Sequence, residues 1–158
     1  MLKQPFLIFS MQLDNTPTLN QGRLVLYDWE LGHIGRWVAT SGLGQYQKIG
    51  GWSKQGGGVC PASYQCNPTF ANHWVEVAPI NLGHVKGVEG NGYAMTPFEV
   101  RTKEGVERSD LLIHRDANVP GSMGCIVLPS DEFEDFEEVF EAQCSGHDKV
   151  KLWIQYNF

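Results

Sequence analysis

Residues 109–130, SDLLIHRDANVPGSMGCIVLPS, carry the strongest structural signal in the chain. Two apolar runs typical of β-strands flank the turn-forming residues 117–124; His114 closes the first run and Cys125 opens the second. When two such runs lie side by side in one sheet, the loop between them brings the imidazole close to the thiol. The segment therefore predicts two neighbouring strands and a candidate site at their ends.

Similar runs continue in both directions, and the segments between them carry Pro, Asn and Gly, as turns do. Leu24 and Leu26 alternate with Val25 and Tyr27, which is the period of two typical of a half-buried strand. The strand-like runs are FLIFSMQL, RLVLYDW, HIGRWVAT, HWVEVAPI, FEVRT, DLLIHRD, GCIVLP and VKLWIQYN. We therefore expect a mainly β protein that ends on a strand.

One amphipathic helix is expected over about residues 131–145, because apolar residues recur there at three- and four-residue steps. These residues are Phe133, Phe136, Val139 and Phe140. We expect this stripe to pack on the core and the acidic face of residues 131–141 to be solvated. Ser130 or Asp131 is the expected N-cap, in a capping box, and Gly146 ends the helix.

The bulk properties limit the classes of function. The length of 158 residues fits a single domain, 1–158. The formal net charge is −6 and no Lys/Arg cluster is present, so we expect no nucleic-acid partner. No run reaches the ~20 apolar residues that span a bilayer, so no membrane segment is expected either. The N-terminus does not resemble a signal peptide, so we expect a protein made in the cytoplasm without a leader. We also expect a monomer.

The segment from residue 41 to residue 72 is rich in Gly, Ser, Pro and Gln and is expected to be a long loop. Loops of this length are often functional, and Trp52 either lines a substrate groove or packs the loop onto the body of the domain. Four possible zinc ligands lie in or after it, namely Cys60, Cys66, His73 and His84. The spacing of the two cysteines departs from that of usual zinc sites, so we expect no metal and no other cofactor.

Cys125 and His114 have the chemistry of a nucleophile and its base. A free thiol has a pKa near ~8.5, and a neighbouring imidazole either accepts its proton or stabilises the thiolate. Ser122 and Gly124 are small, so main-chain N–H groups near the thiol are expected to form an oxyanion hole. Arg115 and Asp116 follow the His, and we expect them to contact substrate. Asp116 then orients the imidazole, binds a substrate amine or caps the turn, while Arg115, like Arg108, pairs with a substrate carboxylate.

His114 followed by residues 122–126, SMGCI, resembles the active-site signature of L,D-transpeptidases (the YkuD-type catalytic domain). That family has a His, a loop, and then Ser/Thr-His-Gly-Cys before an apolar residue. The strong match covers residues 110–129, and residues 95–98 are faintly similar to a second family motif. Met123 stands where the family usually has a second His, and the His-to-Cys loop is short, which is typical of a divergent, compact branch.

The resemblance implies a β-sandwich of mixed sheets with one helix, and a cysteine acyltransferase that acts on peptidoglycan stem peptides in the cell wall or periplasm. It implies that Cys125 attacks the bond after the third stem residue and forms a thioester. His114 is then the base that reprotonates the leaving amine, and Ser122 and Gly124 belong to the oxyanion turn. An amine from a second stem completes a cross-link, whereas water completes a carboxypeptidase reaction.

Two alternatives remain open. The same residues suit a peptidoglycan-cleaving carboxypeptidase or endopeptidase, such as a phage lysis enzyme or a secreted effector. The second alternative is a non-catalytic β-domain that binds cell wall through aromatic residues around Trp52. A papain-like hydrolase fits poorly, because in that class the Cys precedes the His along the chain.

Overall fold

The structure is a computed structural model, and it describes residues 3–13, 21–43, 46–47, 51–53, 57–59, 73–85, 89–96, 100–116 and 125–157. Within these ranges the chain forms short strands, one α-helix and one short 3-10 helix. The elements are β1 (Phe6–Gln12), β2 (Gly22–Tyr27), β3 (His33–Ser41), η2 (Gly51–Ser53), β4 (His73–Glu76), β5 (Ile80–Asn81), β6 (Asn91–Thr96), β7 (Val100–Arg101), β8 (Glu107–Arg108), β9 (Leu112–Arg115), β10 (Ile126–Leu128), α1 (Ser130–Cys144) and β11 (Lys149–Asn157).

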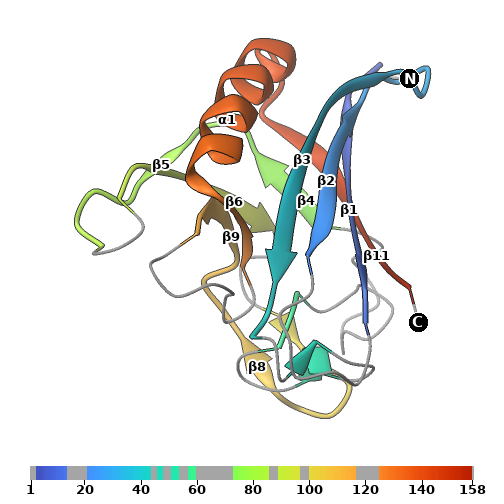
Figure 1. Cartoon of the computed structure of the whole chain (residues 1–158), viewed down its shortest axis with the longest axis vertical. Helices are drawn as coiled ribbons and strands as arrows, with labels where there is room; N and C mark the ends of the chain where they lie inside the picture. The colour runs from blue at the N-terminus through green and yellow to red at the C-terminus, as the bar shows by residue number, and fades with distance from the viewer. Residues whose placement is uncertain are drawn as a thin grey trace.

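Nine strands form one sheet in the order β4-β11-β1-β2-β3-β10-β9-β6-β5, and a pairing of β4 with β6 closes it on itself (Figure 1). The pairs β1–β11 and β9–β10 are parallel, and the other pairs among the described strands are antiparallel. The expected mainly β class with one helix and a C-terminal strand is confirmed. The layers expected as separate sheets of a sandwich are joined into one closed sheet.

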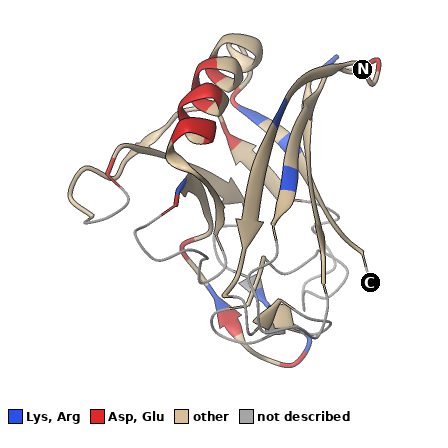
Figure 2. Cartoon of the chain, in the orientation of Figure 1, with Lys and Arg blue, Asp and Glu red and all other residues tan. Residues whose placement is uncertain are grey.

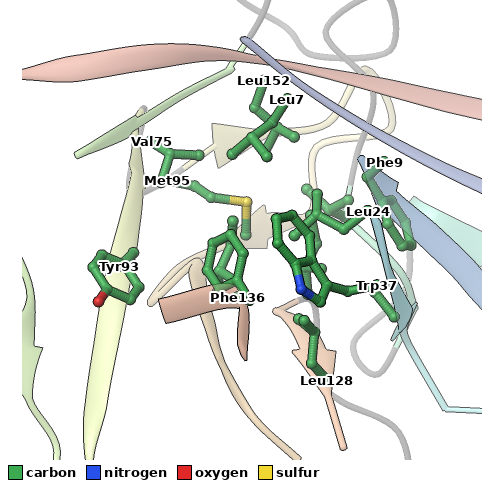
Figure 3. Packing of buried hydrophobic residues seen from close by; sticks show 14 of the residues in the cluster. Leu7, Phe9, Leu24, Trp37, Val75, Tyr93, Met95, Leu128, Phe136 and Leu152 are labelled. Carbon is green, nitrogen blue, oxygen red and sulfur yellow. The ribbon is translucent and has the colours of Figure 1, made fainter. Parts of the chain in front are cut away.

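Alternate strand residues fill the interior of this closed sheet. Leu7 and Phe9 of β1 stand beside Leu26 and Leu24 of β2, and all four are fully buried (Figure 3). Their outward neighbours along the same strands are more exposed, as the period of two predicts. Burying each such side chain contributes about 1.5–3 kcal/mol, so the alternating pattern fixes which face of each strand turns inward.

Helix α1 packs its apolar stripe against the sheet, as expected. Phe136 meets the Trp37 ring edge-on at 5.0 Å, and Phe140 meets Tyr93 of β6 at 5.1 Å. The expected side-chain cap is wrong: Pro129 occupies the N-cap position and no side-chain cap hydrogen bond forms there. Among the described residues, no helix has the length and apolar character needed to cross a membrane.

The acidic face of α1 is only partly solvated, in contrast to the expectation. Figure 2 shows acidic residues gathered on this helix. Asp135 accepts a hydrogen bond from Trp37 Nε1 at 2.7 Å, and Glu132 accepts one from the Val38 main-chain N–H at 3.2 Å. The hydroxyl of Tyr93 lies 2.6 Å from a carboxylate oxygen of Glu141. These carboxylates therefore attach the helix to strands β3 and β6.

Candidate functional site

The neighbouring strands β9 and β10 position His114 and Cys125. Strands β9 and β10 pair in parallel, with Val127 beside His114. Cys125 directly precedes β10, and the same register continued by two residues sets it beside Leu112. Because Ile113 is buried in the core, its neighbours Leu112 and His114 point to the outer face of the sheet, and Cys125 shares that face. The sequence-based expectation that the two residues are brought to adjacent strands is met.

The imidazole of His114 is held in one tautomer. Its Nδ1 lies 2.6 Å from the main-chain oxygen of Arg115, and a carbonyl oxygen only accepts hydrogen bonds. Nδ1 therefore carries the proton, and Nε2 keeps a lone pair that can accept another. Burial lowers the pKa of His114 below its ordinary value, although the hydrogen bond to Arg115 opposes this. At neutral pH the residue is an uncharged base.

The thiol of Cys125 is partly exposed and protonated at rest. Burial is the main cause that raises its pKa to about 11, and the Asp110 carboxylate adds to the increase. The Leu112 main-chain N–H and the Arg108 guanidinium act in the opposite direction. Cys125 Sγ donates a hydrogen bond to the main-chain oxygen of Asp110 at 3.2 Å. The resting thiol is therefore neutral and turned towards residue 110.

Cys125 and His114 are close, but the resting thiol points away from the imidazole. They are one strand apart and two residues apart along the strands, a Cα separation on the order of 8 Å from ideal sheet spacings. Asp110 precedes Leu112, whereas His114 follows it, so the hydrogen bond to Asp110 draws Sγ away from Nε2. A change of side-chain rotamer at Cys125 is the step that brings the two atoms towards each other.

Asp110 adopts a left-handed backbone conformation, with φ of 58°. This region is costly for most residues, although Asp tolerates it better than most. Asp110 lies two residues before β9, and its carbonyl oxygen accepts the hydrogen bond from the thiol. Strained backbone of this kind is concentrated at functional sites.

A hydrogen-bond framework holds the chain around Cys125. Ser41 at the end of β3 donates its hydroxyl to the Cys125 main-chain oxygen at 2.8 Å and accepts the Val59 N–H at 3.0 Å. Gly42 follows with φ of 91°, and a Cβ there would lie 2.5 Å from the Gly58 nitrogen. The end of β3, which holds the Cys125 main chain, is thereby joined to residues 57–59.

Arg108 is a buried charge close to this framework, with only 2% of its surface exposed. Its guanidinium donates to the main-chain oxygens of Trp52 at 2.6 Å, Gly58 at 3.2 Å and Gly57 at 2.8 Å. The expectation that it pairs with a substrate carboxylate is therefore wrong. Its role is to hold residues 51–53 and 57–59 against β8, and its charge favours the Cys125 thiolate.

An apolar wall stands beside His114. Gly92 of β6 is its partner across the sheet. A Cβ at Gly92 would lie 2.8 Å from Leu82 Cδ1, so Leu82 packs directly over the glycine on the outer face. Leu82 is 7% exposed, so a buried apolar side chain covers the strand partner of His114.

The three residues expected to bind substrate lie in different settings. Arg115 forms a partly exposed ion pair with Glu89 at 3.2 Å. Asp116 donates its main-chain N–H to Leu128 at 2.7 Å, which extends the parallel pairing beyond β9. Trp52 is 4% exposed, and its ring stacks on Tyr156 with centroids 5.8 Å apart. Of the two roles considered for Trp52, packing of the loop is the one observed, and a place in an open groove is wrong.

Several sequence-based expectations fall on residues that the structure does not describe. Ser122 and Gly124, the expected oxyanion turn, lie outside the described ranges, as do Cys60 and Cys66. Ser41, Arg108 and Asp110 have roles at the site that were not foreseen. Of these three residues, only Asp110 has a role that the local sequence could have indicated, because Asp directly before an apolar run suits a left-handed turn.

Comparisons of the chain with protein-family models, curated proteins and solved structures give no match. The chemistry available to the site therefore follows from its own residues. They supply a neutral thiol on Cys125, a neutral imidazole with a free lone pair on His114, and the main-chain N–H of Leu112.

Proposed function

We propose that the chain is a cysteine acyltransferase of the L,D-transpeptidase type that acts on peptidoglycan stem peptides. Cys125 is the nucleophile and His114 its base. The observation that carries the proposal is the Nδ1–H tautomer of His114, which leaves a basic Nε2 on the same face of the sheet as the thiol. A neutral imidazole beside a cysteine is the arrangement that nucleophilic acyl transfer requires.

The reaction begins when substrate displaces Cys125 from the Asp110 oxygen. Because the pKa of the thiol is about 11, a standing thiolate–imidazolium pair is not the reactive form. His114 Nε2 instead removes the thiol proton as Sγ bonds to the substrate carbonyl carbon. The C–N bond of the stem peptide then breaks, and the leaving amine takes the proton from His114. A thioester on Cys125 and a free amine are the products of this half of the reaction.

The second half transfers the acyl group to an acceptor. An amine from another stem attacks the thioester carbonyl, His114 takes its proton, and the sulfur leaves and regains a proton as the thiol. With water as acceptor the same steps give a shortened stem, which is the carboxypeptidase alternative. Leu82 packs over Gly92, the strand partner of His114, and we expect this apolar surface to favour the amine over water as acceptor.

One observation favours the non-catalytic alternative. The raised pKa of Cys125 and its hydrogen bond to Asp110 are also what an unreactive thiol in a binding domain would have. The two functions differ in what Cys125 does once substrate is present, so an assay with substrate separates them.

The test is mass spectrometry of purified tetrapeptide muropeptides after incubation with the protein. Cys125→Ala and His114→Gln remove the nucleophile and the base, and Cys144→Ala is the matched control, since it removes a buried thiol distant from the strand pair. We expect cross-linked dimers or tripeptides with the unaltered chain and with Cys144→Ala, and neither product with the other variants. Unchanged muropeptides with a folded, unaltered chain would contradict the proposal and favour a binding function.

A further inference from the structure

An open aromatic groove lies on the outer face of the sheet, far from Cys125. It is formed around β1, β4 and β11 and has a volume of about 420 Å³. In the closed strand order, β11 and β1 stand opposite β10 and β9. The groove is therefore a second candidate site that shares no residue with the first. Its volume lies within the ~300–1,000 Å³ range of small-ligand sites.

Three indole rings line the groove, and two of them are strongly exposed. Trp29 is 48% exposed and Trp153 is 37% exposed, whereas Trp37 and Trp52 elsewhere in the protein are at most 4% exposed. The third indole, Trp74, lines the same groove together with Phe6. An exposed cluster of large flat rings has no role in the core and is typical of a binding surface.

Aromatic rings on one side of the groove contact one another. Phe6 stacks on Tyr27 with centroids 5.3 Å apart and meets Trp153 at 4.9 Å. These residues project from the regular strands β1, β2 and β11, which preforms this side of the groove, whereas Trp29 lies in the turn after β2. A preformed wall lowers the entropic cost of binding.

Lysines stand over the same rings. The Nζ of Lys3 lies 4.5 Å from the centre of the Trp29 ring, and those of Lys149 and Lys151 lie 4.9 and 5.5 Å from that of Trp74. Lys151 lines the groove, and no acidic side chain does so among the described residues. Figure 2 shows basic residues along β11 and acidic ones on α1. The groove is thus locally cationic in a chain of net charge −6.

We infer that this groove binds an acidic glycan, a chain of pyranose sugars that carries carboxylate groups. A pyranose ring has an apolar C–H face, which packs on an indole, and hydroxyl edges, which hydrogen-bond to groups such as the Gln4 amide at the groove. The lysine ammonium groups complement the carboxylates. Single-stranded nucleic acid also stacks on aromatic rings, but its phosphate backbone requires a long basic track, and the described lysines here gather at one groove.

The inference is tested by binding, in the Cys125→Ala form of the full chain so that no turnover occurs. The acidic probe is peptidoglycan glycan strands stripped of their peptides, and the neutral probe is the hexamer of N-acetylglucosamine. Tryptophan fluorescence and calorimetry follow each titration. The variants are Trp29→Ala and Trp153→Ala for stacking and Lys151→Gln for charge. Ile80→Ala is the control, an exposed apolar residue on β5 outside the groove.

We expect saturable binding of the acidic strands, weakened about tenfold by either Trp variant, as for aromatic anchors at other interfaces. Lys151→Gln should weaken binding of the acidic probe and leave binding of the neutral probe unchanged. Ile80→Ala should change the binding of neither probe. Absence of binding, or binding insensitive to both Trp variants, would overturn the inference. Binding of oligothymidylate but of neither glycan would also overturn it, in favour of nucleic acid. Because the muropeptide assay reports only on Cys125, failure of acyl transfer and failure of glycan binding are separate results.

Discussion

The main-chain oxygen of Asp110 accepts a hydrogen bond from the Cys125 thiol at 3.2 Å, and Asp110 itself has a left-handed backbone with φ of 58°. The resting thiol is therefore held in its neutral form. The same residue also raises the pKa of the thiol through its carboxylate, after the larger effect of burial. Burial and Asp110, two residues before β9, therefore both lower the reactivity of the Cys125 thiol.

Asp110→Asn is expected to lower the pKa of Cys125 from about 11, because it removes the nearby negative charge while Asn still tolerates the left-handed region. The measurement is the rate of alkylation by iodoacetamide between pH 7 and pH 11. The midpoint should move to lower pH in the variant. Asp131→Asn, which removes an exposed carboxylate of α1, is the control and should leave the profile in place.

Transfer activity is expected to fall as pH decreases through the pKa of His114, which burial sets below its ordinary value of 6.5. The base acts only when neutral, so the acidic limb of the pH–rate profile should have its midpoint below pH 6.5. The free energy of unfolding should change with pH in the same direction. The unfolded state binds the His114 proton more readily than the folded state, so stability is lost as pH falls below 6.5. An acidic limb centred above that value would contradict the assignment.

His114→Gln should lower the transfer rate by about 10²–10⁴, the usual contribution of a general base. Its effect on the free energy of unfolding should stay near ~1 kcal/mol, the worth of the Nδ1 hydrogen bond to Arg115. Chemical denaturation beside the muropeptide assay separates the two effects. An equal loss of activity and of folded protein would assign His114 a structural role instead.

Ser41→Ala removes the hydroxyl that joins Cys125 to Val59, and it leaves a buried N–H without this partner. We expect a loss of about 1–3 kcal/mol in the free energy of unfolding. Ser145→Ala is the matched control, since its hydroxyl makes one exposed hydrogen bond to Ala142 and should cost less than ~0.5 kcal/mol. Equal losses for the two variants in urea denaturation would argue against the framework around Cys125.

Glu137→Gln should stabilise the protein at neutral pH. The Tyr93 hydroxyl lies 2.9 Å from Glu137 and 2.6 Å from Glu141, but it has one proton to donate. The two carboxylates are also four residues apart on α1, a like-charge spacing that costs about 0.2–0.5 kcal/mol in a helix. Glu138→Gln removes an exposed charge of the same helix and is the control. A lower melting temperature for Glu137→Gln than for Glu138→Gln would refute this account.

The strands with alternating apolar residues were predictable, because burial of one face depends on local sequence. Strand β6 was not predicted, since Asn91 and Gly92 at its start are typical of a turn. It is a strand because β4 and β9 both pair with it and complete its hydrogen bonds. The cap of α1 was wrong because Pro129 occupies the N-cap position, leaving Ser130 and Asp131 inside the helix.

The candidate site was predictable in part, because its two strands also have a local pattern of apolar residues. The adjacency of His114 and Cys125 follows from two apolar runs joined by a short loop. The rotamer of the thiol depends on the backbone angle of Asp110, and the main-chain contacts of Arg108 join segments about fifty residues apart in sequence. The hydrogen bond from Trp37 to Asp135 spans 98 positions. Contacts at such separations follow from the closed sheet and leave no local pattern.

The pairing of β1 with β11 sets the order in which this protein can assemble. During synthesis the β1–β2–β3 meander leaves the ribosome early, with one long edge of β1 unpaired until β11 has been made. The sheet closes through β11 and β4, so a nascent chain that lacks β11 has an open seam along β1. Closure of the sheet therefore requires β11, and we expect a chain without β11 to associate through its unpaired β1 edge.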